Sequence, residues 1–97
     1  MLNSKQRSNL RSQASVLEPI GQVGKNGVNE NAIKSFSDAL DARELIKITV
    51  LETCETSAKE TGVILSDALN AEFVCAIGRK VILYRRSNKQ GINHIEY

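Results

Sequence analysis

The sequence has few of the residues from which most catalytic and metal sites are built. Its 97 residues include one histidine, two cysteines and no tryptophan. Cys54 and Cys75 form no CxxC pair, so a zinc site would lack ligands and no metal is expected. We interpret both cysteines as free thiols of a reducing compartment, with Cys75 packed in an apolar strand. His94 lies in a polar C-terminal segment, where no catalytic role is expected.

Long apolar segments are also missing. No apolar run approaches the roughly 18 residues that a membrane span needs, and the polar N-terminus, "MLNSKQRSNLRSQ", lacks the apolar core of a secretory signal. Hydrophobic residues make up 41% of the chain and charged residues 25%, which is typical of a single soluble domain. We therefore expect a cytoplasmic protein without a membrane partner. Residues 1–88 are expected to form its domain, and residues 89–97 a polar, mobile tail.

The formal net charge of +2 conceals a segregation of charge along the chain. Residues 1–27 carry four basic and one acidic side chain, residues 28–78 four basic and nine acidic, and residues 79–97 five basic and one acidic. If the fold brings the two ends together, their basic face suits a polyanionic partner. Scattered solubilising charges are the alternative. The side chains that we assign to this face are Lys5, Arg7, Arg11, Lys25, Arg79, Lys80, Arg85 and Arg86.

Hydrophobic periodicity predicts seven elements. The helices are expected over residues 4–14, 29–42 and 57–70, and the strands over 19–23, 44–52 and on both sides of Gly78-Arg79 within 72–86. Strands separated by helices imply parallel pairing with right-handed crossovers, and the closing hairpin adds an antiparallel pair. The prediction is a single-domain α/β sandwich of order α-β-α-β-α-β-β, with helices packed on a mixed four-stranded sheet.

Alternation within the strands assigns residues to faces. The groups expected to share a face are Ile20 with Gln22, Ile46 with Ile48 and Val50, and Phe73 with Cys75 and Ile77. Gly62 inside the third helix costs about 1 kcal/mol relative to alanine, which favours close packing at that point. Gly21 is likewise assigned to packing.

A glycine-rich segment, "IGQVGKNGVN" (residues 20–29), connects the first strand to the second helix. Gly24 and Gly27 could simply provide positive φ for a tight turn, and the short pattern by itself favours this interpretation. The alternative is a loop whose backbone contacts phosphate, because glycines remove the Cβ atoms that would hold an anion away and Lys25 adds a charge.

Known nucleotide-binding patterns do not fit this segment. A Walker A loop needs Gly-Lys followed by Ser or Thr, and Asn26 stands where that hydroxyl would be. Asp38, Asp41 and Glu44 surround a predicted helix end, where a solvated surface explains them better than an acid/base pair. Ser57 is interpreted as a helix cap. No catalytic set, cofactor or small-molecule substrate is expected.

Four stretches in this order resemble one family: "SKQRSNLRSQA" (4–14), "LEPIGQVGKNGV" (17–28), "ELIKITVL" (44–51) and "AIGRKVILYRR" (76–86). They resemble the CRM domain (chloroplast RNA splicing and ribosome maturation), and within it the bacterial single-domain YhbY proteins. The resemblance implies a mixed four-stranded sheet with helices on it, similar to the C-terminal domain of a bacterial translation initiation factor. It also implies RNA binding, which in the bacterial members is to precursors of the large ribosomal subunit.

Carried onto this sequence, the resemblance implies specific contacts. Residues Gly24, Lys25, Asn26 and Gly27 match the family's GxxG loop, which is compared with the loop that clamps the RNA backbone in KH domains. Lys5, Arg7 and Arg11 match the basic first helix, and Arg85 follows the "LY" of the last strand. Two departures are Ser15-Val16, where the family often has histidines or other polar basic residues, and Cys75, where glutamine is common.

We therefore expect a monomeric, non-catalytic protein that binds ribosomal RNA and assists assembly of the large subunit. The expected RNA-binding residues are Gly24, Lys25, Asn26, Gly27, Lys5, Arg7, Arg11, Arg79, Lys80 and Arg85. A protein-docking adaptor that uses the basic face is one alternative, and nuclease treatment of a pull-down would separate the two. A small nucleotide-binding enzyme is the other, and a thermal-shift screen with nucleotides and magnesium would detect it.

Overall fold

The computed structural model describes residues 2–87 and 94–95 and confirms the predicted order of elements. The elements are α1 Ser4–Ala14, β1 Gly21–Val23, α2 Glu30–Arg43, β2 Leu45–Val50, α3 Ala58–Leu69, β3 Glu72–Ile77 and β4 Lys80–Tyr84. Helix ends follow the predicted caps. The side chain of Asn29 accepts a hydrogen bond from the Ala32 N–H at 2.8 Å, and that of Ser57 accepts one from the Glu60 N–H at 3.1 Å, which satisfies N–H groups that a helix start leaves unpaired.

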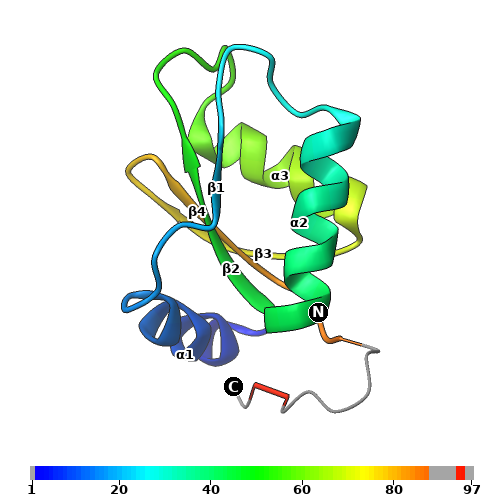
Figure 1. Cartoon of the computed structure of the whole chain (residues 1–97). Helices are drawn as coiled ribbons and strands as arrows, with labels where there is room; N and C mark the ends of the chain where they lie inside the picture. The colour runs from blue at the N-terminus through cyan, green and yellow to red at the C-terminus, as the bar shows by residue number, and fades with distance from the viewer. Residues whose placement is uncertain (1, 88–93, 96–97) are drawn as a thin grey trace.

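The four strands form one mixed sheet in the order β1-β2-β4-β3. β1 pairs parallel with β2, and β4 pairs antiparallel with β2 on one side and β3 on the other. The last strand of the described residues therefore lies between two earlier ones (Figure 1). Gly78 has φ +57° and begins the two-residue turn that joins β3 to β4.

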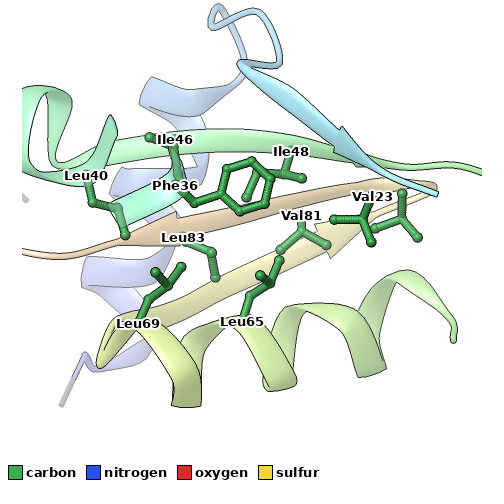
Figure 2. Close-up of a cluster of buried hydrophobic side chains, with 10 residues drawn as sticks. Val23, Phe36, Leu40, Ile46, Ile48, Leu65, Leu69, Val81 and Leu83 are labelled. Atoms are coloured by element: carbon green, nitrogen blue, oxygen red, sulfur yellow. The ribbon is translucent and has the colours of Figure 1, made fainter. Parts of the chain in front are cut away.

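Helices cover both faces of the sheet. α2 and α3 pack on one face and enclose the larger apolar cluster, whose side chains point toward one another in Figure 2. The residues labelled there are Val23, Phe36, Leu40, Ile46, Ile48, Leu65, Leu69, Val81 and Leu83. α1 packs on the opposite face, where Leu10 and Ala14 meet Leu45, Val74, Ile82 and Tyr84. The sheet is thus the middle layer of three.

Two glycines allow close packing on the α2–α3 side, as predicted. A Cβ on Gly21 would lie 2.9 Å from Cε1 of Phe36. A Cβ on Gly62 would lie 3.1 Å from both Phe73 Cε1 and Val81 Cγ1. Because such contacts are too short for a carbon side chain without movement of its neighbours, the absence of Cβ lets α2 and α3 approach the sheet.

The predicted faces were wrong at two places. In β3 the register shifts between Phe73, which pairs with Leu83, and Cys75, which pairs with Ile82, so Val74 is an extra residue. This bulge leaves Phe73 against the α2–α3 cluster and puts Cys75 against the α1 cluster. In β1, Gln22 is exposed and the buried residue is Val23, whereas Ile20 packs against the larger cluster just before the strand begins.

Glu44, expected on a solvated surface, is fully buried. It links α2 to β2 with φ +64°, and its carboxylate accepts hydrogen bonds from the Ser87 N–H at 2.7 Å, His94 Nδ1 at 2.6 Å and the Ile95 N–H at 2.8 Å. Burial by itself would raise the pKa of Glu44, but these hydrogen bonds and the charge of His94 hold that pKa below its ordinary value. The buried carboxylate thereby ties Ser87, His94 and Ile95 to the junction of α2 and β2.

The other two carboxylates of that group remain accessible: Asp38 is exposed and Asp41 is partly exposed. The domain boundary predicted at residue 88 falls at the start of residues 88–93, outside the described part of the chain, and stays a prediction. Within residues 2–87 and 94–95, no helix combines the length and apolar character that crossing a bilayer requires.

Candidate nucleic-acid interface

Residues Gly24 to Gly27 form a tight turn at the junction of β1 and α2. The Gly27 N–H donates to the Gly24 carbonyl at 2.9 Å, and Lys25 and Asn26 are exposed at its tip. No backbone hydrogen bond ties the N–H groups of these two tip residues to other described residues. The turn therefore offers two free donors and an ammonium group to an anion from solvent.

The two glycines of the turn serve different purposes. Gly27 has φ +64°, and a Cβ there would meet nothing within 4 Å, so its backbone faces open space. A Cβ on Gly24 would lie 3.1 Å from Leu51 Cδ1 and 3.3 Å from Thr53 Oγ1. Gly24 thus lets the turn pack against the chain after β2, while Gly27 provides a backbone conformation that side chains disfavour.

The start of α2 is poorly suited to bind an anion. The Asn29 side chain already occupies one of the first-turn N–H groups, and Glu30 places an exposed carboxylate in the same turn. A carboxylate there interacts favourably with the positive end of the helix dipole and repels a second anion. An anion would therefore bind at Lys25 and Asn26.

Two other connections lie at the same end of the sheet as the turn (Figure 1). The Leu51 N–H donates to the Val23 carbonyl at 2.8 Å, and the Val50 N–H donates to the Arg79 carbonyl at 2.7 Å. The Arg79 guanidinium lies 3.1 Å from Glu52, with 56% and 81% of the two side chains exposed. Such an exposed pair contributes little stability, so Arg79 could exchange this carboxylate for a phosphate at low cost.

Helix α1, which carries three more basic residues, lies toward the other end of the sheet (Figure 1). Lys5, Arg7 and Arg11 are exposed, and α1 contains no acidic residue. Its start is closed by a reciprocal capping box between Asn3 and Gln6. The buried stripe of α1 is narrow, which leaves most of its surface polar and positively charged.

Lys80 and Lys47 lie on the α1 side of the sheet, because their chain neighbours Ile46, Ile48 and Val81 belong to the α2–α3 cluster. Lys80 is half-buried at the start of β4 and pairs with Thr49. Lys47 was not among the predicted site residues. It lies between Ile46 and Ile48 in "LIKITV", and strand alternation therefore points it to the face opposite theirs, which is the α1 side. Its Nζ donates to the Leu17 carbonyl at 3.0 Å, so it also anchors the segment that joins α1 to β1.

Arg85 has a different position from the other predicted contacts. Its guanidinium donates to the Leu69 carbonyl at 2.8 Å, to the Ser37 carbonyl at 2.9 Å and to Asp41 at 2.9 Å. Only 21% of the side chain is exposed. These bonds join the C-terminal end of α3 to α2, on the sheet face opposite α1. We therefore assign Arg85 a structural role and leave it out of the proposed RNA contacts.

Both cysteines are free and partly buried. Burial raises the pKa of the Cys75 thiol, opposed by the charge of the nearby Arg11. The hydrogen bond between Cys54 and the Thr56 hydroxyl, at 3.3 Å, lowers the pKa of Cys54. Among the residues that the structure describes, no group of three His, Cys, Asp or Glu side chains could hold a metal ion.

Comparison with known proteins gives this geometry a context. The sequence pattern of the CRS1 / YhbY (CRM) domain matches residues 2–85. The chain is 47% identical over 92 residues to a Bacillus subtilis (strain 168) protein named "Probable RNA-binding protein YqeI", covering 93% of this chain and 96% of that one. It is 32% identical over 95 residues to a Haemophilus influenzae protein named "RNA-binding protein", covering 94% and 92% of the two chains.

The fold is likewise similar to a solved structure. The hypothetical protein SAV1595 from Staphylococcus aureus, determined in solution, superposes with a TM-score of 0.79 at 44% sequence identity. The similarity covers 93% of this chain and 94% of that one. Pattern, sequence and structure thus agree over nearly the whole chain, and the protein belongs to the CRS1/YhbY (CRM) domain family.

Proposed function

We propose that this protein binds RNA and, through ribosomal RNA, assists assembly of the large ribosomal subunit. The names of its relatives support RNA as the partner. The observation that carries the proposal is the Gly24–Gly27 turn, which presents free backbone donors and Lys25 at an open surface. The protein acts in the cytoplasm as a monomer, by binding alone.

Binding starts from phosphates rather than from bases. The turn and Lys25 hold one stretch of the RNA backbone, and Arg79 and Lys80 continue the contact along the α1 side of the sheet. Lys5, Arg7 and Arg11 then hold the flanking phosphates. Because each of these contacts displaces counterions, affinity should fall steeply as salt is raised.

Substitution of Gly27 tests the turn with a matched pair of variants. Asparagine and aspartate have nearly the same shape and both tolerate positive φ, so Gly27→Asn and Gly27→Asp should fold with similar melting temperatures. Gly27→Asp places a carboxylate where we propose phosphate binds and should nearly abolish binding to ribosomal RNA in a mobility-shift assay. Gly27→Asn should bind far more tightly than Gly27→Asp. Equal affinities of the two variants would contradict the proposed contact.

Sedimentation of cell extracts tests the role in assembly. The tagged protein should travel with precursors of the large subunit, and nuclease treatment should release it. A protein that remains bound after the RNA is digested would instead be a docking adaptor.

A further inference from the structure

Four side chains form a row across all four strands on the α1 side of the sheet. Gln22 pairs with Thr49, Thr49 pairs with Lys80, and Lys80 pairs with Ile77. Their chain neighbours Val23, Ile48 and Val81 belong to the α2–α3 cluster, so alternation turns the row toward the opposite face. We call these residues (Gln22, Thr49, Lys80 and Ile77) the sheet row.

α1 does not cover the sheet row. The apolar contacts of α1 begin further along the strands, at Ile82, and continue to Leu45 and Tyr84. Gln22 is exposed, Thr49 and Lys80 are half-buried, and 44% of Ile77 is exposed. The face that α1 shields over most of its length is thus open at the end nearest the turn.

The sheet row connects two parts of the proposed RNA contact, the Gly24–Gly27 turn and Arg79. Gln22 is two residues before Gly24, and Ile77 directly precedes the two-residue turn that contains Arg79. Strands about 4.8 Å apart make the row roughly 14 Å long. Four-stranded sheets in other RNA-binding domains accommodate two or three bases on their open face.

We propose that the sheet row contacts the bases of single-stranded RNA whose phosphates are held by the turn and α1; this rests on the function proposed above. The Gln22 amide and the Thr49 hydroxyl both donate and accept hydrogen bonds, as reading a base edge requires. Ile77 offers an apolar surface to a base, and Lys80 a charge to a phosphate. In a duplex the base edges that these groups could reach lie in grooves, so the row selects unpaired RNA.

The variant Gln22→Ala/Ile77→Ser removes the two most exposed members of the row without changing charge. Its probe is a single-stranded RNA of about 12 nucleotides, within the range that small binding domains cover. Affinity should fall about 10-fold, which is the usual cost of losing one base contact. The dependence on salt should not change, because no phosphate contact is lost. Affinity for a duplex RNA of the same length should change less than about 2-fold.

Ile64→Ser provides a matched control. Ile64 has the same 44% exposure as Ile77 but lies on α3, on the other side of the sheet. The control should bind single-stranded RNA like the unaltered protein, and melting temperatures should confirm that both variants fold.

The outcomes separate this inference from the proposed function. Unchanged affinity of Gln22→Ala/Ile77→Ser beside a strong loss in Gly27→Asp would overturn the sheet row and leave RNA binding by the turn intact. Equal losses for single-stranded and duplex RNA would also overturn it. If the double variant binds RNA normally but no longer joins ribosomal particles, the row contacts a protein and the inference fails. Absence of RNA binding by the unaltered protein would overturn both proposals.

Discussion

Replacement of Glu44 by glutamine should strongly destabilise the fold. The carboxylate is fully buried and accepts three hydrogen bonds from the chain after β4. With its oxygen in the place of Oε2, glutamine keeps the bonds to Ser87 and His94, but its NH₂ then faces the Ile95 N–H, which is also a donor. Losing one charge-assisted bond and weakening two should cost about 2–4 kcal/mol. For a domain of this size, that lowers Tm by at least about 8 °C.

Urea denaturation at pH 7 measures this cost directly. Glu52→Gln is the matched control, because that carboxylate is 81% exposed in a surface pair with Arg79, and its loss should cost less than about 1 kcal/mol. The pKa of Glu44 is lowered in the folded state, so its contribution is complete above the unfolded pKa of about 4.3 and is lost as pH falls through the lower folded value. The stability difference between the unaltered protein and Glu44→Gln should therefore narrow between pH 5 and pH 3.

Two results would refute this reasoning. A Glu44→Gln protein as stable as the unaltered one would show that the hydrogen bonds of the carboxylate to Ser87, His94 and Ile95 do not stabilise the fold. A stability difference that stays constant from pH 5 to pH 3 would show that ionisation of Glu44 is not what stabilises the fold.

Two further predictions separate binding residues from structural ones. Lys25→Ala should flatten the slope of log affinity against log salt by about 0.7, as expected for one lost single-strand phosphate contact. The control Lys34→Ala, on the exposed side of α2, should leave this slope unchanged. An unaltered slope for Lys25→Ala would remove Lys25 from the interface. Arg85→Met should destabilise the fold by about 2–4 kcal/mol in urea denaturation, because the Leu69 and Ser37 carbonyls lose their donor, yet it should bind RNA like the unaltered protein. A specific loss of RNA affinity would return Arg85 to the interface.

Hydrophobic periodicity in the sequence was sufficient to predict the helices and strands of this fold. Helix spacing in "NAIKSFSDAL" and alternation in "LIKITV" are local signals, and Asn29 and Ser57 mark helix starts through their own side-chain chemistry. The bulge at Val74 left no such signal, because Val74 and Cys75 are both apolar and an extra apolar residue looks like continued strand. Only the pairing of Cys75 with Ile82 reveals it.

Two features could not be predicted from the sequence, the burial of Glu44 and the sheet row, because both depend on residues far apart in the chain. A carboxylate side chain is normally exposed to solvent. Glu44 can be buried because Ser87, His94 and Ile95 donate hydrogen bonds to it. These donors lie more than 40 positions later in the sequence, so no local pattern reveals them. The position of Arg85 could have been predicted. It follows Leu83 by two residues and Val81 by four, so strand alternation puts it on the same face as these two residues, the α2–α3 face. The sheet row depends on strand register, which no single segment encodes.

The position of β4 has a consequence for synthesis of the protein. β4 is made after the other three strands of the sheet, yet it lies between β2 and β3. Val81 and Leu83 complete one apolar cluster, and Ile82 and Tyr84 complete the other. Until residue 84 has emerged from the translating ribosome, neither cluster can close, and the three-residue β1 is the only sheet partner of β2. The nascent chain must therefore keep its apolar strands from aggregating until β4 has been made, and then fold as one unit dominated by long-range contacts.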